Sequence, residues 1–434
     1  MEHEHLKAGF AREDITPEIG TALYGYKPDN FSESLHDPLK VSAVCFERNG
    51  IIILLLDFDL CLISNDLTHE IRTKLSAETG IDYDNIVLHA THTHSGPNVG
   101  GEKGWGEIDH KYADGIMKPK AIKAAKAACA ELVEVKIGIG TTESRVGMNR
   151  RMVERNGDVV LGQNPWGPFD PTMTVIVFKK ISDGKPLFNI VHYGCHGTAC
   201  GCTTEITRDW YGVMLDRLEE LSGAPSFFIN AAEGDVGPRI TNGWTGGGMD
   251  YVMELGGIAS RDAIDAWRKI KDFRDDTEIK LIAEDVKLPY RDLPSLEYCE
   301  AEIAKVKHPE ELINIFFLEY QHMLDVKEVY DKHIPKPECF KFRQTVFSIG
   351  PLLFVPLPYE FFSEIQLRLR QYSPYAYTLC MSNSNGSCGY FPTKDAIAKG
   401  GYEVKSFIAG EAFSLTDDAD QHLIDAEMAI IEKL

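Results

Sequence analysis

Two histidines follow directly on an apolar, strand-like segment, 85–90, in the segment 91–97, whose sequence is THTHSGP. Imidazole nitrogens bind transition metals and exchange protons near neutral pH, so His92 and His94 are candidates for catalysis. Residues two apart on an extended chain point to opposite faces. Unless the backbone turns after the strand, the spacing therefore indicates one metal ligand and one neighbour directed at a substrate. A pair of packed or turn-capping loop histidines is the alternative.

His196 and Glu360 are the next candidates. His196 also follows a strand-like segment and precedes a glycine-containing turn, whereas His192, inside that segment, is expected to be a hydrogen-bonded core histidine. Glu360 ends the segment 356–360, and a carboxylate there could instead favour the positive end of a helix dipole. Two histidines and one carboxylate with an open position form the ligand set expected of a catalytic zinc hydrolase.

The segment 230–239, NAAEGDVGPR, combines a strand end with two glycines and a proline. Backbone N–H groups freed in such a turn could bind a developing oxyanion. A strand-to-helix turn without catalytic role is the alternative. Asp235 and Asp209 have two interpretations of equal weight: orientation of a ligand histidine, or a turn aspartate and a helix-capping aspartate.

Strand-like and helix-like segments alternate over the first 240 residues and must position these side chains. Strands are expected at 41–46, 51–58, 85–90, 135–140, 173–179, 188–193 and 226–230, and helices at 66–78, 116–133 and 209–221. The alternation predicts an α/β fold with a mixed, largely parallel sheet covered by helices. Ligands collect outside the carboxyl ends of such strands. Three polar turns, 91–101, 192–202 and 230–239, lie there, so we expect them to meet at one site.

The second half is less regular. Helices are expected at 249–272 and 296–332, and strands at 279–287, 341–349 and 352–355. No repeat or low-complexity linker divides the chain. We therefore expect a single catalytic domain over residues 1–434 with a helical insertion at 290–338.

Charge and composition exclude several classes of function. The 66 acidic and 45 basic side chains give a formal net charge of −21, which disfavours a nucleic-acid partner. The longest aliphatic run, 51–56, is too short to span a membrane, so no integral membrane association is expected. The N-terminus lacks signal-peptide features. Ten dilute cysteines, three of them clustered at Cys195, Cys200 and Cys202 without a second pair, indicate reduced thiols and a cytoplasmic location.

Short motifs along most of the chain resemble the catalytic domain of the neutral/alkaline non-lysosomal ceramidase family. They occur in the family's order: AGFAREDITP at 8–17, DPL at 37–39, LDFDL at 56–60, HTHSGP at 92–97, MNR at 148–150, HGT at 196–198, GDVGP at 234–238, LPYE at 357–360, NGSCGYFPT at 385–393 and GYE at 401–403. Each motif is short, but their combination and order are specific.

The resemblance implies one catalytic zinc ion. His92, His196, Glu360 and Tyr390 match the family's ligands, and His94, Arg150 and Tyr402 match residues that orient the substrate or stabilise the oxyanion. The chain departs from the family where Gly237 replaces the serine of the motif GDVSP, and Arg239 replaces a smaller polar residue. We also expect the chain to lack the family's C-terminal immunoglobulin-like domain.

The prediction is a zinc-dependent hydrolase that cleaves an amide or ester bond of a small-molecule substrate with metal-activated water. His94 is the first candidate for the general acid, and Glu233 is the second. Arg150 and Arg239 suggest a small polar, carboxylate-bearing substrate. A true ceramidase or N-acyl lipid amidase, a metal-dependent lyase or isomerase, and a noncatalytic ligand-binding relative remain alternatives. Assembly into a homo-oligomer is left open.

Overall fold

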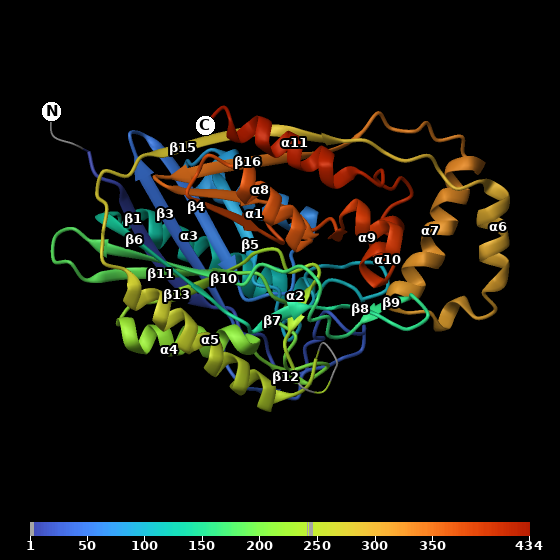
Figure 1. Cartoon of the computed structure of the whole chain (residues 1–434), viewed down its shortest axis with the longest axis horizontal. Helices are drawn as coiled ribbons and strands as arrows, with labels where there is room; N and C mark the ends of the chain where they lie inside the picture. Colours follow the sequence, from blue (N-terminus) through green and yellow to red (C-terminus); the bar gives the residue numbers. More distant parts are fainter. Residues whose placement is uncertain (1–3, 241, 243–245) are drawn as a thin grey trace.

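An eight-stranded sheet forms the centre of the computed structural model, which describes residues 4–240, 242 and 246–434 (Figure 1). The strand order is β13-β11-β10-β6-β1-β3-β4-β5. In that order the strands span Ser226–Asn230, Pro186–Tyr193, Thr172–Lys180, Val133–Glu143, Lys7–Asp14, Lys40–Arg48, Ile51–Phe58 and Ile86–Ala90. The strands predicted in this half of the chain are therefore confirmed.

The α/β class and the mixed sheet are confirmed, but the expectation that most strand pairs are parallel is wrong. In this sheet β11 pairs with β13 and β4 with β5 in parallel, whereas the other neighbours are antiparallel. The connection between β3 and β4 shows the reason. Asn49 and Gly50 have φ angles of 53° and 77°, and a two-residue turn of this kind joins only antiparallel strands.

A second sheet packs face to face on the first. Its strands β15, β16, β17 and β19 span Ile279–Leu288, Phe340–Ile349, Leu352–Pro356 and Tyr377–Met381. Alternation along the strands divides the side chains between the two faces of the large sheet. Val44 and Phe46 share a buried cluster with Phe347 and Phe354 of the second sheet, whereas Val41 belongs to a cluster on the opposite face.

Helices cover the two outer faces, so the molecule has four layers. The helices against the large sheet are α1 (Asn65–Thr79), α3 (Lys118–Ala130), α4 (Asp209–Ser222) and α5 (Met249–Lys269), and those against the second sheet are α8 (Ser363–Tyr372) and α11 (Ala419–Ile431). Figure 1 shows α4 and α5 on one side of the strands and α8 and α11 on the other.

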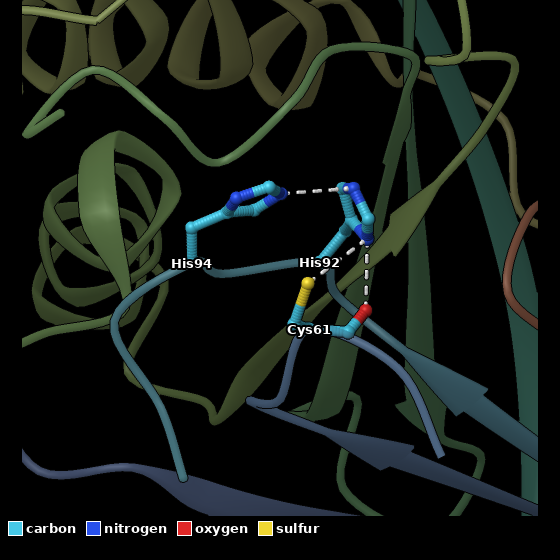
Figure 2. Close-up of side chains that lie close together, drawn as sticks. All are labelled: Cys61, His92 and His94. Atoms are coloured by element: carbon cyan, nitrogen blue, oxygen red, sulfur yellow. Dashed lines mark hydrogen bonds between the residues drawn. The ribbon is translucent and has the colours of Figure 1, made fainter. Parts of the chain in front are cut away.

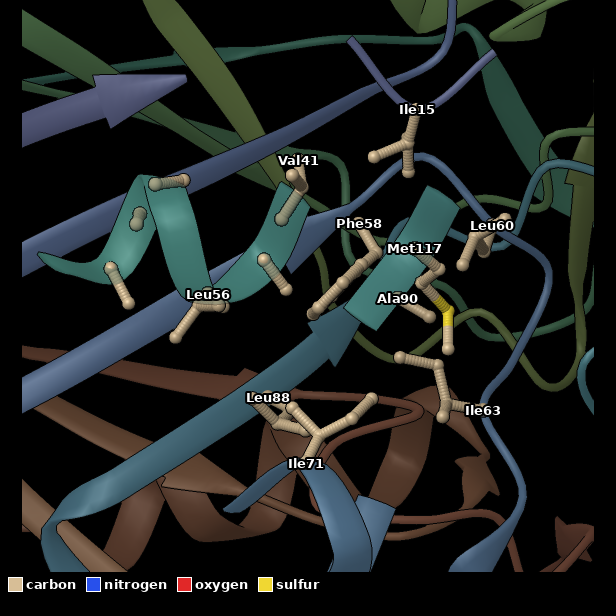
Figure 3. Close-up of a cluster of buried hydrophobic side chains, with 14 of the residues drawn as sticks. Ile15, Val41, Leu56, Phe58, Leu60, Ile63, Ile71, Leu88, Ala90 and Met117 are labelled. Atoms are coloured by element: carbon tan, nitrogen blue, oxygen red, sulfur yellow. The ribbon is translucent and has the colours of Figure 1, made fainter. Parts of the chain in front are cut away.

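Apolar side chains fill the layer between the large sheet and its helices. Figure 3 shows Leu56 and Phe58 of β4 together with Ile71 of α1 and Met117, which precedes α3. Burying a side chain of this size contributes about 1.5–3 kcal/mol relative to leaving it exposed. A Cβ atom on Gly9 would lie 1.9 Å from the carbonyl oxygen of Ala128, so glycine there permits α3 to lie directly on β1.

The remaining elements are short or belong to the less regular half. The two-stranded pairs are β2 (Ser34–Leu35) with β12 (Glu205–Ile206), β7 (Gly147–Asn149) with β14 (Val236–Pro238), β8 (Arg151–Val153) with β9 (Val159–Leu161), and β18 (Glu360–Phe361) with β20 (Tyr390–Phe391). The other α-helices are α2 (His110–Tyr112), α6 (Leu296–Lys305), α7 (Asn314–Asp331), α9 (Lys394–Lys399) and α10 (Tyr402–Ala409). A π-helical turn spans Ala113–Met117, and 3₁₀ turns span Tyr83–Asn85 and Pro309–Glu311.

Helices α6 and α7 fall within 290–338, the segment for which a helical insertion was expected. The division of 1–434 into one catalytic domain with that insertion stays a prediction. In the described part of the chain, no helix is long and apolar enough to cross a membrane. The ten cysteines are free thiols.

A buried carboxyl group distant from the strand ends generates a test of this packing. Glu427 of α11 is fully buried, and the Gln344 amide Nε2 donates a hydrogen bond of 2.8 Å to its Oε1. Burial raises the pKa of Glu427 to about 8 from a usual value of 4.5. Between about pH 4.5 and pH 8 the carboxyl group is therefore protonated in the folded protein and ionised in the unfolded chain. The free energy of unfolding falls as the pH rises through this range.

We expect Glu427→Gln, which keeps the neutral shape and the acceptor for Gln344, to remove this loss. The variant should match the wild type at pH 4.5 and exceed it by as much as about 4 kcal/mol at pH 8. Denaturant unfolding at several pH values measures the difference, with Glu432→Gln at an exposed position as the control. A parallel pH dependence in Glu427→Gln and wild type would contradict the assignment.

Candidate active site

Three predicted ligands meet at the carboxyl ends of the strands. The Nε2 atoms of His92 and His196 lie 3.3 and 3.1 Å from the same carboxylate oxygen, Oε2 of Glu360. All three side chains are buried. His92 and His196 come from two of the three polar turns that were expected to meet, whereas Glu360 comes from a segment outside those turns.

Backbone carbonyl groups fix both imidazoles from behind. The Nδ1–H of His92 donates to the carbonyl oxygen of Cys61 at 2.8 Å, and the Nδ1–H of His196 donates to that of Glu233 at 2.9 Å. These hydrogen bonds leave each Nε2 directed at Glu360. Such outer contacts set the tautomer and ring orientation of metal-binding histidines.

The space between these atoms favours positive charge. Oε2 of Glu360 is buried and accepts no hydrogen bond from a described residue, although two imidazole nitrogens face it. Burial opposes ionisation, but the imidazoles lower the pKa of Glu360 well below its usual value. A metal cation would satisfy the nitrogen and oxygen lone pairs together, so His92, His196 and Glu360 fit a metal ion.

A proton would compete with a metal ion for the donor atoms of His92, His196 and Glu360. Burial lowers the pKa of His92, but the nearby Cys61 thiol and Glu360 carboxylate outweigh that effect and raise the pKa. Burial, with Arg150 and His92 nearby, lowers the pKa of His196 to about 3, so this imidazole stays neutral and able to coordinate. Metal binding is therefore expected to displace a proton from the group.

His94 lies beside His92, not on the opposite face. Figure 2 shows the two rings directed toward one another, and their Nε2 atoms are 3.1 Å apart. The cause is a turn: β5 ends at Ala90, and His92 has a φ of 72°. The expectation from strand alternation is therefore wrong here. The Nδ1 of His94 is buried without a hydrogen-bond partner among the described residues, and burial lowers the pKa of His94.

Tyr390 and Arg150 form the next part of the site. The Tyr390 hydroxyl lies 3.4 Å from Nε2 of His196, and Arg150 donates to it at 2.9 Å. Strands β18 and β20 pair Glu360 with Tyr390 in register, which brings these two together. Arg150 is itself held by Glu403, 2.9 Å from its Nε. The second oxygen of Glu403 pairs with Arg151 at 2.7 Å, so the two arginines share one carboxylate.

Tyr402 lines a small cavity of about 30 Å³ beside the ligand group. His92, His94, Glu360 and Tyr390 also line it. Tyr402 begins α10 after two glycines, of which Gly401 has a φ of 104°. Burial raises the pKa of Tyr402, so its hydroxyl is a neutral hydrogen-bond donor.

The two aspartates organise backbone and do not touch the ligand imidazoles through any contact in the described structure. Asp235 accepts hydrogen bonds of 2.8 Å from the backbone N–H and the hydroxyl of Ser363, and one of 3.0 Å from Asn149. Asp209 accepts from the backbone N–H groups of Ala199 and Cys200, in the turn after His196. Both carboxylates therefore shape loops that carry site residues.

Gly237 and Arg239 lie apart from the cavity, and neither is among its lining residues in the described chain. Gly237 belongs to β14 and pairs with Met148, while the Arg239 side chain is exposed. Arg239 therefore does not face the cavity, whereas Arg150 shares the single carboxylate of Glu403 with Arg151. The carboxylate-bearing substrate stays a prediction.

Comparison with known proteins identifies the relatives of this arrangement. The family model described as neutral/alkaline non-lysosomal ceramidase, N-terminal, matches residues 6–249. The chain belongs to this family. Among curated proteins, no sequence gives a significant match.

Two solved structures share the fold. The neutral ceramidase from Pseudomonas aeruginosa has a TM-score of 0.76 and 19% sequence identity, over 99% of this chain and 75% of that chain. A ceramidase complexed with C2 has a TM-score of 0.75 and 18% identity, over 99% and 76%. At this identity the likeness shows the fold alone, whereas membership in the ceramidase family implies a hydrolase.

Several residues of this ceramidase-family site were missed by sequence analysis. Cys61 supplies the carbonyl group that holds His92, and Glu403 pairs with Arg150 and Arg151. Asn383 donates to Glu233 at 2.8 Å, and Glu102 lines the small cavity. Cys61 and Glu403 stand next to or within motifs already singled out, which is the signal that could have found them. Glu102 directly follows the polar turn 91–101, whereas Asn383 carries no such signal.

Removal of a ligand tests the metal group directly. We expect His92→Ala and Glu360→Ala to weaken zinc binding at least about 100-fold, because each leaves two of the three buried donors. Metal analysis after dialysis against buffered zinc measures the change. His422→Ala, at an exposed position of α11, is the matched control and should bind zinc as the wild type does. Unchanged zinc content in His92→Ala would refute the ligand assignment.

Proposed function

We propose that the chain is a zinc-dependent hydrolase that cleaves an amide or ester bond of a small polar substrate. One observation carries the proposal: Nε2 of His92 and Nε2 of His196 face an otherwise unsatisfied oxygen of Glu360, and both rings are anchored by their other nitrogen. Two imidazoles and a carboxylate are a ligand set typical of catalytic zinc, and we add the Tyr390 hydroxyl as the fourth donor.

A zinc ion held by these residues would lower the pKa of a water molecule and polarise a carbonyl oxygen. The chain's own residues supply the rest of the chemistry in this proposal. Tyr402 faces the cavity with a neutral hydroxyl, which can donate to the oxygen on which negative charge develops. Arg150, held by Glu403, fixes the Tyr390 hydroxyl in place.

His94 is the residue proposed to carry a proton to the leaving group. Its ring lines the cavity, and its Nδ1 has no hydrogen-bond partner among the described residues. Glu233, the other candidate, is fully buried and is not a lining residue of that cavity; its Oε1 accepts from Asn383, and its Oε2 is buried without a partner among the described residues. Geometry therefore favours His94 over Glu233.

The environment supports a polar substrate over a two-chain lipid. Glu102 lines the same small cavity as His92 and also a larger one beside it. A carboxylate in the wall is costly next to a hydrocarbon chain, because the charge loses water without gaining a partner. A true ceramidase activity therefore stays the second candidate, supported by the family. A cytoplasmic location remains a proposal from the sequence.

Metal removal and restoration test the reaction class. We expect the zinc-loaded protein to hydrolyse members of a panel of short N-acyl amides and esters, to lose at least about 100-fold in rate after chelation, and to recover when zinc is returned. Ceramide in detergent is included in the panel. Turnover that survives chelation would overturn the metal mechanism, and ceramide turnover equal to that of the best polar substrate would overturn the preference for polar substrates.

The oxyanion role of Tyr402 has a separate test. Tyr402→Phe removes the hydroxyl and keeps the ring, so we expect kcat to fall about 10- to 1000-fold while zinc content stays at the wild-type level. Steady-state kinetics and metal analysis on the same preparation measure both quantities. Tyr372→Phe, an exposed residue at the end of α8, is the control. A loss of zinc in Tyr402→Phe would assign the residue to the metal group instead.

A further inference from the structure

A second, larger cavity adjoins the one at the ligand group. It has a volume of about 470 Å³, which suits a small-molecule ligand. The two cavities share the lining residues Glu102, Trp105, Gly389 and Ser406. A substrate with its reacting bond beside His92 would therefore extend past Glu102 into the larger space.

Negative charge predominates on the walls of the larger cavity. Glu102 lines it together with Asp66 and Glu411, which are exposed, and the one basic lining residue in the described chain is Lys103. The Nζ of Lys103 lies 2.8 Å from a carboxylate oxygen of Asp325, so its charge is already paired. Asp66, Glu102 and Glu411 make no ion pair with a described residue. An anionic ligand would be repelled here, and a cationic one attracted.

Aromatic rings complete the lining. Tyr290, Phe340, Phe407 and Phe413 line the cavity with Trp105. The face of an aromatic ring attracts ammonium groups, and a hydrocarbon spacer packs well on the same surface. Carboxylates and aromatic faces in one cavity are features that recognise an alkylammonium group.

Among the lining carboxylates, Glu102 is best placed to bind the positive charge of an ammonium group. Among the described residues, it is the one carboxylate that lines both cavities. Glu360 lines only the smaller cavity. The Tyr24 hydroxyl donates to its Oε2 at 2.7 Å, which holds the side chain in position. No described residue is hydrogen-bonded to Oε1.

We infer that the larger cavity binds a primary ammonium group of the substrate, with Glu102 as its counter-ion. The substrate class is then an amide or ester that also carries an amino group on a short apolar spacer. This inference rests on the proposed hydrolase function for the reaction, but the binding of the ammonium group does not depend on it.

Matched substrates test the inference in the zinc-loaded protein. In a series of N-(ω-aminoalkyl)acetamides and their methyl-terminated counterparts, the wild type should prefer the ammonium member of at least one pair at least about 10-fold in kcat/KM. In Glu102→Gln that ratio should fall toward one. Glu310→Gln, at an exposed position, is the control and should keep the preference. Turnover of both members at equal rates by the wild type in every pair would overturn the inference.

Binding separates this inference from the reaction itself. Calorimetry with pentylammonium and 1-pentanol on the metal-free protein should show tighter binding of the ammonium, weakened at least about 10-fold in Glu102→Gln. If no amide or ester is hydrolysed but this binding pattern holds, the hydrolase proposal fails and the inference stands. If hydrolysis occurs but pentylammonium binds no better than 1-pentanol, the inference fails and the hydrolase proposal stands.

Discussion

The site depends on one asparagine that joins strand ends from both edges of the large sheet. Asn230 ends β13, at the opposite edge from β5, yet its Nδ2 donates to the carbonyl oxygen of Thr91 at 3.0 Å. Its Oδ1 accepts from the backbone N–H of Cys195, just after β11. Its carbonyl group accepts from Ser382, just after β19 of the second sheet. The segments that carry His92 and His196 can meet because these hydrogen bonds bring the strand ends together.

A buried histidine extends this connection into the sheet. The backbone N–H of Asn230 donates to Nε2 of His89, so Nδ1 of His89 carries the proton and donates to Asp57 at 2.6 Å. Burial lowers the pKa of His89 to about 3, which keeps the ring neutral and the tautomer fixed. Every polar atom of the imidazole is thereby satisfied in a dry environment, where an unpaired one would cost about 1–3 kcal/mol.

Unusual backbone conformations occur where the site is assembled. His92, Asp209 and Asn383 have φ angles of 72°, 60° and 45°, a region that residues other than glycine seldom occupy. All three residues are buried; Asn383 contacts His92, and Asp209 holds the turn after His196. Strained backbone conformations persist only where the surrounding contacts fix them, and they are most frequent at functional sites. Arg150 and Arg151 share the carboxylate of Glu403, and neither arginine lines the larger cavity.

The sequence by itself determined the α/β class, most strands and helices, and the three segments of the candidate metal group, because apolar periodicity and turn residues are local properties of the chain. His192 was also correctly interpreted: it is buried and bonded to the carbonyl group of Cys380. Which strands pair, and in which direction, was decided only by the tertiary structure. The same holds for the turn that brings His94 beside His92, for the pairing of Arg150 with Glu403, and for Glu102 at the junction of two cavities. These features arise from contacts between residues far apart along the chain, and no local pattern encodes such contacts.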